Sequence, residues 1–242
     1  MRSPTTAPTL QVCRDCGGGA PLDAHFCPQC TKILSLGRHG DYFSFLGLPR
    51  KLQIDAADLE RRFRTLSRLF HPDYFYNATP AERRASLERS SYLNDAYRTL
   101  KNPVARVEYL LALEGLAPKA ADRGAGASGA DDAAAKQVVP PALLEEVFAL
   151  NEELDEIRRL RAGSAPVEQL RERLERARRP IDARRAAHEL DLQDLSARWD
   201  ALLDAGAGEG QRREVLNALR ERLLERNYIN NLLAGIQREL GS

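Results

Sequence analysis

The sequence lacks a long hydrophobic run, and its first residues lack the apolar stretch of a signal peptide. No apolar segment of the 242-residue chain reaches the roughly 18 residues that a membrane-spanning helix needs. Residues 1–12, MRSPTTAPTLQV, contain no apolar core of a secretion signal. We therefore expect a cytoplasmic protein without membrane contact, or a mitochondrial matrix protein if the source is eukaryotic, although no clear transit peptide is present.

The sequence also lacks an excess of either charge. Its 36 Lys and Arg and 35 Asp and Glu residues give a formal net charge of +1, so the whole molecule has no field that attracts nucleic acid or anionic lipid. Any binding that depends on charge must be local. With 43% hydrophobic and 29% charged residues, the composition is typical of one or two soluble domains with hydrophobic cores.

Cysteine is absent after residue 30, and the four cysteines form the pattern Cys13-x2-Cys16, ten residues, Cys27-x2-Cys30. Each pair can form a tight knuckle around one tetrahedral metal, and in a reducing compartment this pattern favours a metal site over disulfides. We expect structural zinc, because four thiolates leave no open position for catalytic water. Disulfides, a redox CxxC pair and an iron or iron–sulfur occupant are the alternatives. We expect His25 to be exposed and not a ligand.

Composition divides the chain into four segments. Residues 1–40 are rich in Cys, Gly and Pro, and residues 41–117 contain short helical patterns interrupted by Pro and Gly. Small and polar side chains at 118–139 cannot bury enough apolar surface to order the chain, which indicates a flexible linker. Residues 140–242 contain long, charged helical patterns. Strands are scarcely indicated outside the cysteine segment, where knuckle hairpins fit the pattern.

An amphipathic helix is predicted to begin at Ala56, with Asp55 as its N-cap. Four apolar residues recur at spacings of four, three and four and form one stripe. They are Leu59, Phe63, Leu66 and Phe70. At about 100° per residue, Arg61, Arg64 and Arg68 lie on nearly the opposite side. No acidic residue interrupts this basic ridge, so it is either a solvated face or a contact surface for a partner.

A proline ends this helix, since Pro72 disfavours helical geometry at His71 and removes a backbone donor. A second helix is predicted to begin at Pro80, after the capping residue Thr79. The two antiparallel helices then present the tripeptide His-Pro-Asp of residues 71–73 at the tip of a hairpin. An exposed tip of this kind could serve as a recognition element.

This arrangement resembles a J domain, the co-chaperone module that activates DnaK-like chaperones. The resemblance rests on the basic ridge, on the tripeptide, and on NDAYRTLKNP at 94–103. It implies docking on the ATP-bound chaperone, where ATP hydrolysis is triggered. The residues it implies for chaperone binding are His71, Pro72, Asp73, Arg61, Arg64 and Arg68. Tyr74 stands where this family often has lysine, so part of the usual positive potential is missing.

Nothing in the sequence indicates an enzyme. No nucleophile with a motif of its own accompanies His71 and Asp73, since Ser67 is an ordinary helix residue. The chain also lacks a GxxxxGK[ST] phosphate-binding motif. We therefore expect an activator of a partner ATPase.

The C-terminal segment predicts a bundle of three helices. The seam of its first helix follows a four-three spacing at Leu143, Val147, Leu150, Leu154 and Ile157. Leu144 and Phe148 lie about 100° or more from the centre of this seam, so they form either a binding patch or a wider core stripe. We expect His188, which lies on the seam of the second helix, to be a core histidine with its hydrogen bonds satisfied and not a ligand.

Three further segments resemble HscB, the J-protein dedicated to iron–sulfur cluster assembly. They are DYFSFLGLP at 41–49, NPVARVEYLLALEGL at 102–116 and ALLEEVFALNEELDEI at 142–157. The resemblance implies a C-terminal bundle for oligomerisation or scaffold binding, whose partner is the scaffold protein IscU. The residues it implies for scaffold binding are Leu144, Phe148, Glu152 and Tyr228. Some HscB relatives also carry an N-terminal tetracysteine site. Ala149 replaces an acidic residue common in the family.

The sequence thus predicts a mainly α protein with a tetracysteine zinc knuckle module (1–40), a helical-hairpin J domain (41–117), a linker (118–139) and a three-helix bundle (140–242). The expected function is that of a co-chaperone, which stimulates the ATPase of a DnaK- or HscA-like chaperone and delivers IscU to it for cluster assembly and transfer. One alternative is a general J-domain co-chaperone for unfolded clients. The other is a zinc-ribbon nucleic-acid-binding protein, which the near-neutral charge disfavours.

Overall fold

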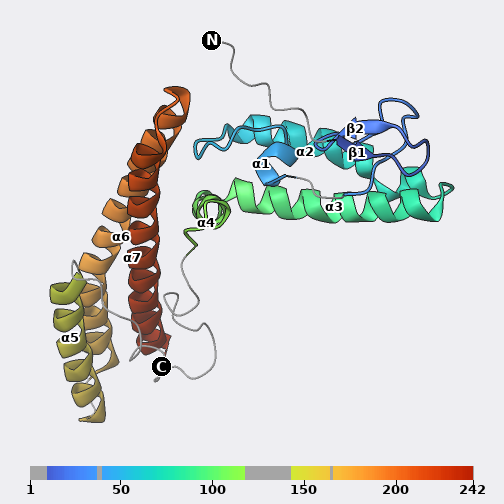
Figure 1. Cartoon of the computed structure of the whole chain (residues 1–242). Helices are drawn as coiled ribbons and strands as arrows, with labels where there is room; N and C mark the ends of the chain where they lie inside the picture. Colours follow the sequence, from blue (N-terminus) through green and yellow to red (C-terminus); the bar gives the residue numbers. More distant parts are fainter. Residues whose placement is uncertain (1–9, 37–39, 118–142, 164–165, 242) are drawn as a thin grey trace. The chain divides into compact units, whose positions relative to one another are not determined.

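The structure is a computed structural model that describes residues 10–36, 40–117, 143–163 and 166–241. It divides into two compact units, Met1–Leu113 and Glu114–Ser242 (Figure 1). The predicted linker at 118–139 lies outside the described residues. None of the described helices combines the length and the apolar composition that a membrane crossing requires.

The first unit begins with two small hairpins in the cysteine segment. Strand β1 (Leu10–Val12) pairs antiparallel with β2 (Gly19–Pro21), and a single bridge joins Phe26 to Ile33. Each hairpin encloses one Cys-x2-Cys pair. The hairpins that the sequence indicated for this segment are therefore present.

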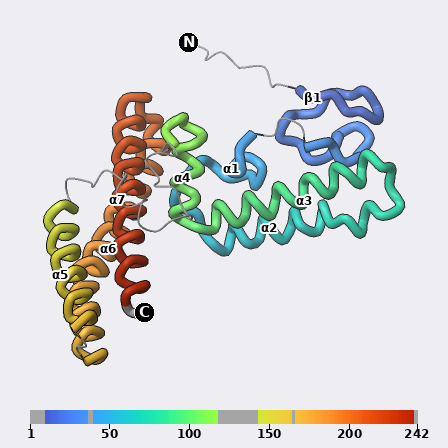
Figure 2. The backbone as a smooth tube through the Cα atoms, turned by 90° about the horizontal axis from the view of Figure 1, so that it is seen from below, coloured from blue at the N-terminus to red at the C-terminus, as the bar shows by residue number. Residues whose placement is uncertain are grey.

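Helices form the rest of the first unit. They are α1 (Tyr42–Phe45), α2 (Ala56–Phe70), the 3-10 turn η1 (Pro72–Phe75), α3 (Pro80–Lys101) and α4 (Pro103–Leu113). Helices α2 and α3 lie side by side and antiparallel in both views of the backbone (Figure 2). The turn η1 lies at the tip of this hairpin, as the predicted break at Pro72 required.

The predicted helix ends are confirmed. At each of these ends, a nearby side chain forms hydrogen bonds with backbone groups that the helix leaves free. Asp55 accepts a hydrogen bond from the backbone N–H of Ala57 at the start of α2. Thr79 and Glu82 form a reciprocal capping box at the start of α3. Asn102 ends α3, and its side-chain oxygen accepts from two backbone N–H groups at the start of α4.

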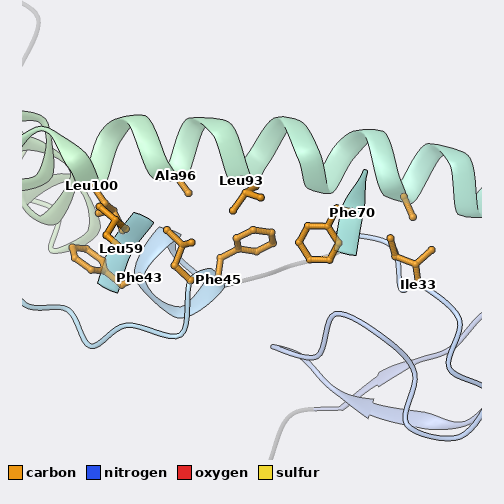
Figure 3. Close-up of a cluster of buried hydrophobic side chains, with 10 residues drawn as sticks. Ile33, Phe43, Phe45, Leu59, Phe70, Leu93, Ala96 and Leu100 are labelled. Carbon is orange, nitrogen blue, oxygen red and sulfur yellow. The ribbon is translucent and has the colours of Figure 1, made fainter. Parts of the chain in front are cut away.

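The core of the first unit lies between α1, α2 and α3 and includes one residue of the cysteine segment, Ile33 (Figure 3). The predicted stripe of α2 contributes to it, with Leu59 and Phe70 fully buried and Phe63 and Leu66 packed at its edge. Its other buried members are Phe43, Phe45, Leu46, Ala85, Leu93, Ala96 and Leu100.

The second unit is a bundle of three helices, as predicted: α5 (Leu144–Ala162), α6 (Val167–Asp204) and α7 (Glu209–Gly241). The glycine-containing stretch after Asp204 separates α6 from α7. The predicted seam of the first helix is buried or half-buried along its whole length. It packs against residues of α6 and α7, among them Leu170, Leu174, Ile181, Ile229 and Ile236.

His188 is a core residue of α6, as expected, but it lacks a hydrogen bond. The ring is almost completely buried, and its Nε2 lies 3.4 Å from Glu225 Oε2. Within the described residues, neither ring nitrogen has a hydrogen-bond partner. Arg222 also contacts Glu225, and its Nη1 lies 3.7 Å from Asp191. Burial lowers the pKa of His188, so the folded bundle favours the neutral ring.

Candidate functional site

The predicted recognition tripeptide lies at the tip of the α2–α3 hairpin and is open to solvent. The His71 side chain is 51% exposed and that of Asp73 is 86% exposed. The backbone N–H of Asp73 lies 3.4 Å from His71 Nδ1, so the imidazole caps the 3-10 turn. Residues of the loop and of the first turns of α3 surround a hollow of about 520 Å³ next to this turn, lined by Pro72, Asp73, Tyr76, Asn77, Arg83 and Leu87.

Three large apolar side chains stand exposed at the same tip. They are Tyr74, Tyr76 and Leu87. Tyr74, directly after the tripeptide, lies with its ring edge-on to the His71 ring, 6.1 Å between centroids. The surface that a partner would meet here is therefore partly aromatic and not only charged.

The basic ridge of α2 is exposed as predicted, but it is not uniformly positive. Arg61 pairs with Asp58 and Arg64 pairs with Glu60, each within one turn of the helix. Contacts with Arg62 and with Arg61 lower the pKa of the Asp58 carboxyl. The prediction that no acid interrupts the ridge overlooked these neighbours, because an arginine side chain is long enough to reach one turn back.

Arg68, one turn before the tripeptide, differs from the other two arginines of the ridge. Its side chain is exposed and makes no ion pair within the described residues. The strongest uncompensated positive charge of the ridge therefore lies at the end nearest to Asp73.

The four cysteines converge at one point of the first unit. Their sulfur atoms all lie within 4.8 Å of one another, and two pairs, Cys13 with Cys30 and Cys16 with Cys27, are 3.6 Å apart. A tetrahedron with metal–sulfur distances of about 2.3 Å has edges of about 3.8 Å. The cluster therefore has the size of a tetrahedral metal site.

The two Cys-x2-Cys knuckles have the same backbone geometry. In each, the first cysteine donates its N–H to the carbonyl five residues later, Gly18 or Lys32. In each, the residue after the second cysteine donates its N–H to the carbonyl of the first at 2.9 Å. That residue has positive φ in both cases, 73° at Gly17 and 58° at Thr31, because the chain must turn back to bring the second sulfur toward the first.

The thiols of the cluster titrate unequally. Backbone hydrogen bonds from Cys30 and Gln29 lower the pKa of Cys27 to about 7. A backbone hydrogen bond with Lys32 favours the thiolate of Cys30, but burial and the neighbouring thiols still raise its pKa to about 12. A divalent cation supplies the positive charge that four adjacent thiolates require. The donor set therefore fits a metal ion held by Cys13, Cys16, Cys27 and Cys30.

The expectation that His25 is exposed was wrong. Its ring is half-buried and lies edge-on against Phe45 and Phe70, 5.0 Å from each ring centroid. Its Nδ1 lies 2.8 Å from Nη1 of Arg89. Burial and the charge of Arg89 lower the pKa of His25 to about 4, so the ring is neutral and Nδ1 accepts the hydrogen bond. Sequence reasoning missed this contact because the partner is 64 residues away.

Arg89 is a second feature that sequence reasoning missed. Its side chain is fully buried in the first unit, on the face of α3 that carries Leu93, Ala96 and Leu100. An arginine is rarely fully buried unless its donors are satisfied. A signal was available in the sequence, because Arg89 lies one turn before Leu93 on the apolar face of the helix.

On the bundle, three of the four predicted scaffold-binding residues share one exposed face of α5. Leu144, Phe148 and Glu152, spaced four residues apart, are all exposed. We call these three residues the α5 patch. Beside it, a groove of about 850 Å³ lies between α5 and α6, and its α5 side includes Glu145 and Ala149.

Tyr228, the fourth predicted scaffold-binding residue, lies on α7 and is only 9% exposed. Its ring belongs to the hydrophobic core of the bundle, together with Leu143 and Val147. Burial raises the pKa of its phenol. The structure therefore gives Tyr228 a packing role, and its contact with a scaffold stays a prediction.

Comparison with known proteins shows the fold. No protein-family model matches the chain. The structure is similar to the crystal structure of human co-chaperone protein HscB, with a TM-score of 0.59, 24% identity, and coverage of 95% of this chain and 98% of the human one. It is also similar to chaperone HscB from Vibrio cholerae, with a TM-score of 0.51, 24% identity, and coverage of 83% and 97%. The predicted resemblance to HscB is confirmed for the fold.

Proposed function

We propose that this protein is a co-chaperone of the HscB type, which activates the ATPase of a DnaK- or HscA-like chaperone and brings an IscU-like scaffold to it for cluster assembly and transfer. The observation that carries the proposal is the exposed His71-Pro72-Asp73 tip of the α2–α3 hairpin, in a chain with the fold of two HscB proteins. In this proposal the protein is not itself an enzyme.

The tip would act through preferential binding. The Asp73 carboxylate is largely exposed and is available to a cationic group of the chaperone. Arg68, which makes no ion pair within the described part of the chain, provides a charge of the opposite sign one turn before the tripeptide. A partner that binds better to one conformation of the chaperone shifts the population toward it by its difference in affinity. Stimulated hydrolysis then follows if the favoured conformation is the one that hydrolyses ATP.

The bundle would bind the scaffold through the α5 patch. Leu144 and Phe148 expose apolar area that the bundle core does not use. Exposed apolar area bordered by charge is typical of a protein-binding surface. Holding the scaffold and the chaperone on one chain raises the effective concentration of each for the other.

The tetracysteine cluster would hold zinc, with the four cysteines as its ligands. The bound metal supplies the charge balance that closes the two knuckles, so its role is in folding. A cytoplasmic location, or the matrix in a eukaryote, belongs to the same proposal, because reduced thiols are needed there for the metal site.

The proposal is tested with the ATPase of a DnaK- or HscA-like chaperone. We expect Asp73→Asn to return the stimulated rate to the basal rate, because the exposed charge is lost while the shape is kept. The matched control is Asp95→Asn, another exposed aspartate of the hairpin, which should stimulate like the parent. Both variants should bind the scaffold normally. Equal stimulation by Asp73→Asn and the parent would disprove the role of the tip.

A competition assay separates the proposal from a general co-chaperone for unfolded clients. We expect an excess of a denatured protein to leave binding of an IscU-like scaffold unchanged. Displacement of the scaffold by the denatured protein would favour the general co-chaperone.

A further inference from the structure

The cysteine module, residues 10–36, contacts both ends of the loop that carries the tripeptide. This tip loop, residues 71–79, follows Phe70 of α2 and precedes Pro80 of α3. On the α2 side, Phe26 stacks on Phe70, with 6.1 Å between centroids. On the α3 side, Lys32 Nζ lies 3.3 Å from Glu82 Oε1, and Glu82 is the residue that completes the capping box. The module is therefore placed to influence the loop from either end.

Arg89 joins two separate segments of the module to α3. Its Nε donates to the Leu34 carbonyl at 2.8 Å, and Nη2 donates to the Ser35 carbonyl at 3.2 Å. Nη1 donates to His25 Nδ1 at 2.8 Å, and Nη2 also lies 3.4 Å from the Ala24 carbonyl. One segment precedes Cys27 and the other follows Cys30. The planar guanidinium can bind both at once because its donors lie in a fixed fork, which a lysine does not have.

The same guanidinium lies over the ring of Phe70, 5.6 Å from its centroid. Phe70 is the residue directly before His71, and it is fully buried. Its carbonyl accepts hydrogen bonds from the hydroxyls of Ser86 at 2.7 Å and Ser90 at 2.9 Å. Figure 3 shows Phe70 and Ile33 on the same side of α3. Helix α3 therefore holds the backbone carbonyl of Phe70, where the chain enters the tip loop. Arg89 and the module hold the Phe70 side chain.

The positions of these contacts depend on the closure of the cysteine cluster. The two segments that Arg89 binds flank the second knuckle, which runs from Cys27 to Cys30. The sulfurs of this knuckle lie within 4.8 Å of the sulfurs of the first knuckle. Without a cation, no coordination bond joins the sulfurs of one knuckle to those of the other, so the two knuckles can separate. The carbonyls would then move away from Arg89 and leave its buried charge without these acceptors, which is unfavourable. Because Arg89 also lies over the Phe70 ring, a shift of the guanidinium toward other acceptors would change the packing of Phe70.

We propose that the cysteine module positions the His71-Pro72-Asp73 tip through Arg89, so that metal bound by the four cysteines controls how well the tip engages the chaperone. Arg89 is a positioning residue in this scheme, since it lies buried behind the tip. The inference rests on the proposed function. It adds that the metal site acts on chaperone activation and does more than stabilise its own module.

The first test replaces Arg89 by lysine, which keeps the positive charge and the helix propensity but removes the fork. We expect amide hydrogen exchange of residues 70–80 to become at least tenfold faster, with exchange in α5, α6 and α7 unchanged. The protein concentration that half-saturates ATPase stimulation should rise by at least fivefold, with little change in the maximal rate. The matched control is Arg98→Lys, at an exposed position of the same helix, which should behave like the parent.

The second test removes the metal from the parent protein with a chelator and measures metal content alongside hydrogen exchange. We expect faster exchange at residues 70–80, as in Arg89→Lys, and reversal on adding zinc. Metal removal should change the tip of Arg89→Lys much less than that of the parent, because the connection is already broken. Circular dichroism identifies a variant that fails to fold, and the metal-removal arm still decides the question in that case.

Unchanged exchange at residues 70–80 after metal removal would overturn the inference. An equal increase throughout α2, α3 and α4 would also overturn it, since the module would then serve general stability only. These outcomes are independent of the proposed function. If the metal-loaded parent does not stimulate any chaperone, the proposed function fails while hydrogen exchange still reports on the connection between module and tip.

Discussion

Replacing Phe148 of the α5 patch by alanine should weaken scaffold binding and leave the fold intact. The side chain is 66% exposed, so the bundle core does not depend on it. A phenylalanine side chain presents about 200 Å², of which about 130 Å² is then available to a partner. At about 25 cal/mol per Å², burial of this area is worth about 3 kcal/mol. Ordering of the interface lowers the net value, and we expect a loss of roughly 10- to 100-fold in affinity.

Leu144 should contribute less, because it is 40% exposed and complete burial of a leucine is worth about 2 kcal/mol. Adding Leu144→Ala to Phe148→Ala should therefore weaken binding by a further factor of up to about four. The thermal unfolding of both variants should stay close to that of the parent, since exposed substitutions usually change stability by less than about 0.5 kcal/mol.

The assay is titration calorimetry with an IscU-like scaffold protein, accompanied by thermal unfolding. The matched control is Leu190→Ala on α6, because Leu190 is 62% exposed and lies outside the α5 patch. It should bind like the parent. The reasoning fails if Phe148→Ala binds the scaffold as tightly as the parent, or if Leu190→Ala weakens binding to the same extent.

Two further predictions concern the metal site and the bundle. A side chain at positive φ costs about 1–2 kcal/mol, part of which returns through the unfolded chain. Gly17→Ala, which has open space around it, should therefore lower metal-loaded stability by about 1 kcal/mol, whereas Thr31→Gly should leave it unchanged or raise it slightly. If urea unfolding shows that Gly17→Ala stabilises the protein or that Thr31→Gly destabilises it, the shared geometry of the knuckles is contradicted. Burial lowers the pKa of His188, so below about pH 6.5 the unfolded chain binds a proton at this ring and the folded bundle does not. The free energy of unfolding therefore decreases as the pH is lowered, by up to about 1.4 kcal/mol per pH unit. Fluorescence of the single tryptophan, Trp199 in α6, should show this acid sensitivity in the parent and less of it in His188→Leu.

The helices and the tip loop could be predicted because their signals are local. A cap such as Thr79 satisfies donors within its own turn, and Pro72 ends a helix whatever surrounds it. The four cysteines are similar, since two-residue spacing already brings each pair together. Helical periodicity placed Leu144 and Phe148 off the seam of their own helix but left open whether they widen the core or face solvent, and the structure shows that both are exposed.

The remaining features could not be predicted because they depend on residues far apart in the chain. The partners of Arg89 lie more than 50 residues earlier, and a charged residue is usually assigned to the surface. His25 was misjudged for the same reason. The ion pairs of Arg61 and Arg64 needed side-chain conformations, and the burial of Tyr228 needed the packing of α7 against α5.

The sequence alone determined where the helices begin and end, which residues form the tip, and that four thiols meet. Each of these follows from chain stiffness, hydrogen-bond capping and spacing within a few residues. Tertiary structure decided that the cysteine module packs behind the tip loop and that a buried guanidinium joins the two. Such a contact is stable only when several distant carbonyls and aromatic rings converge on one charge, and that convergence exists only in the folded chain.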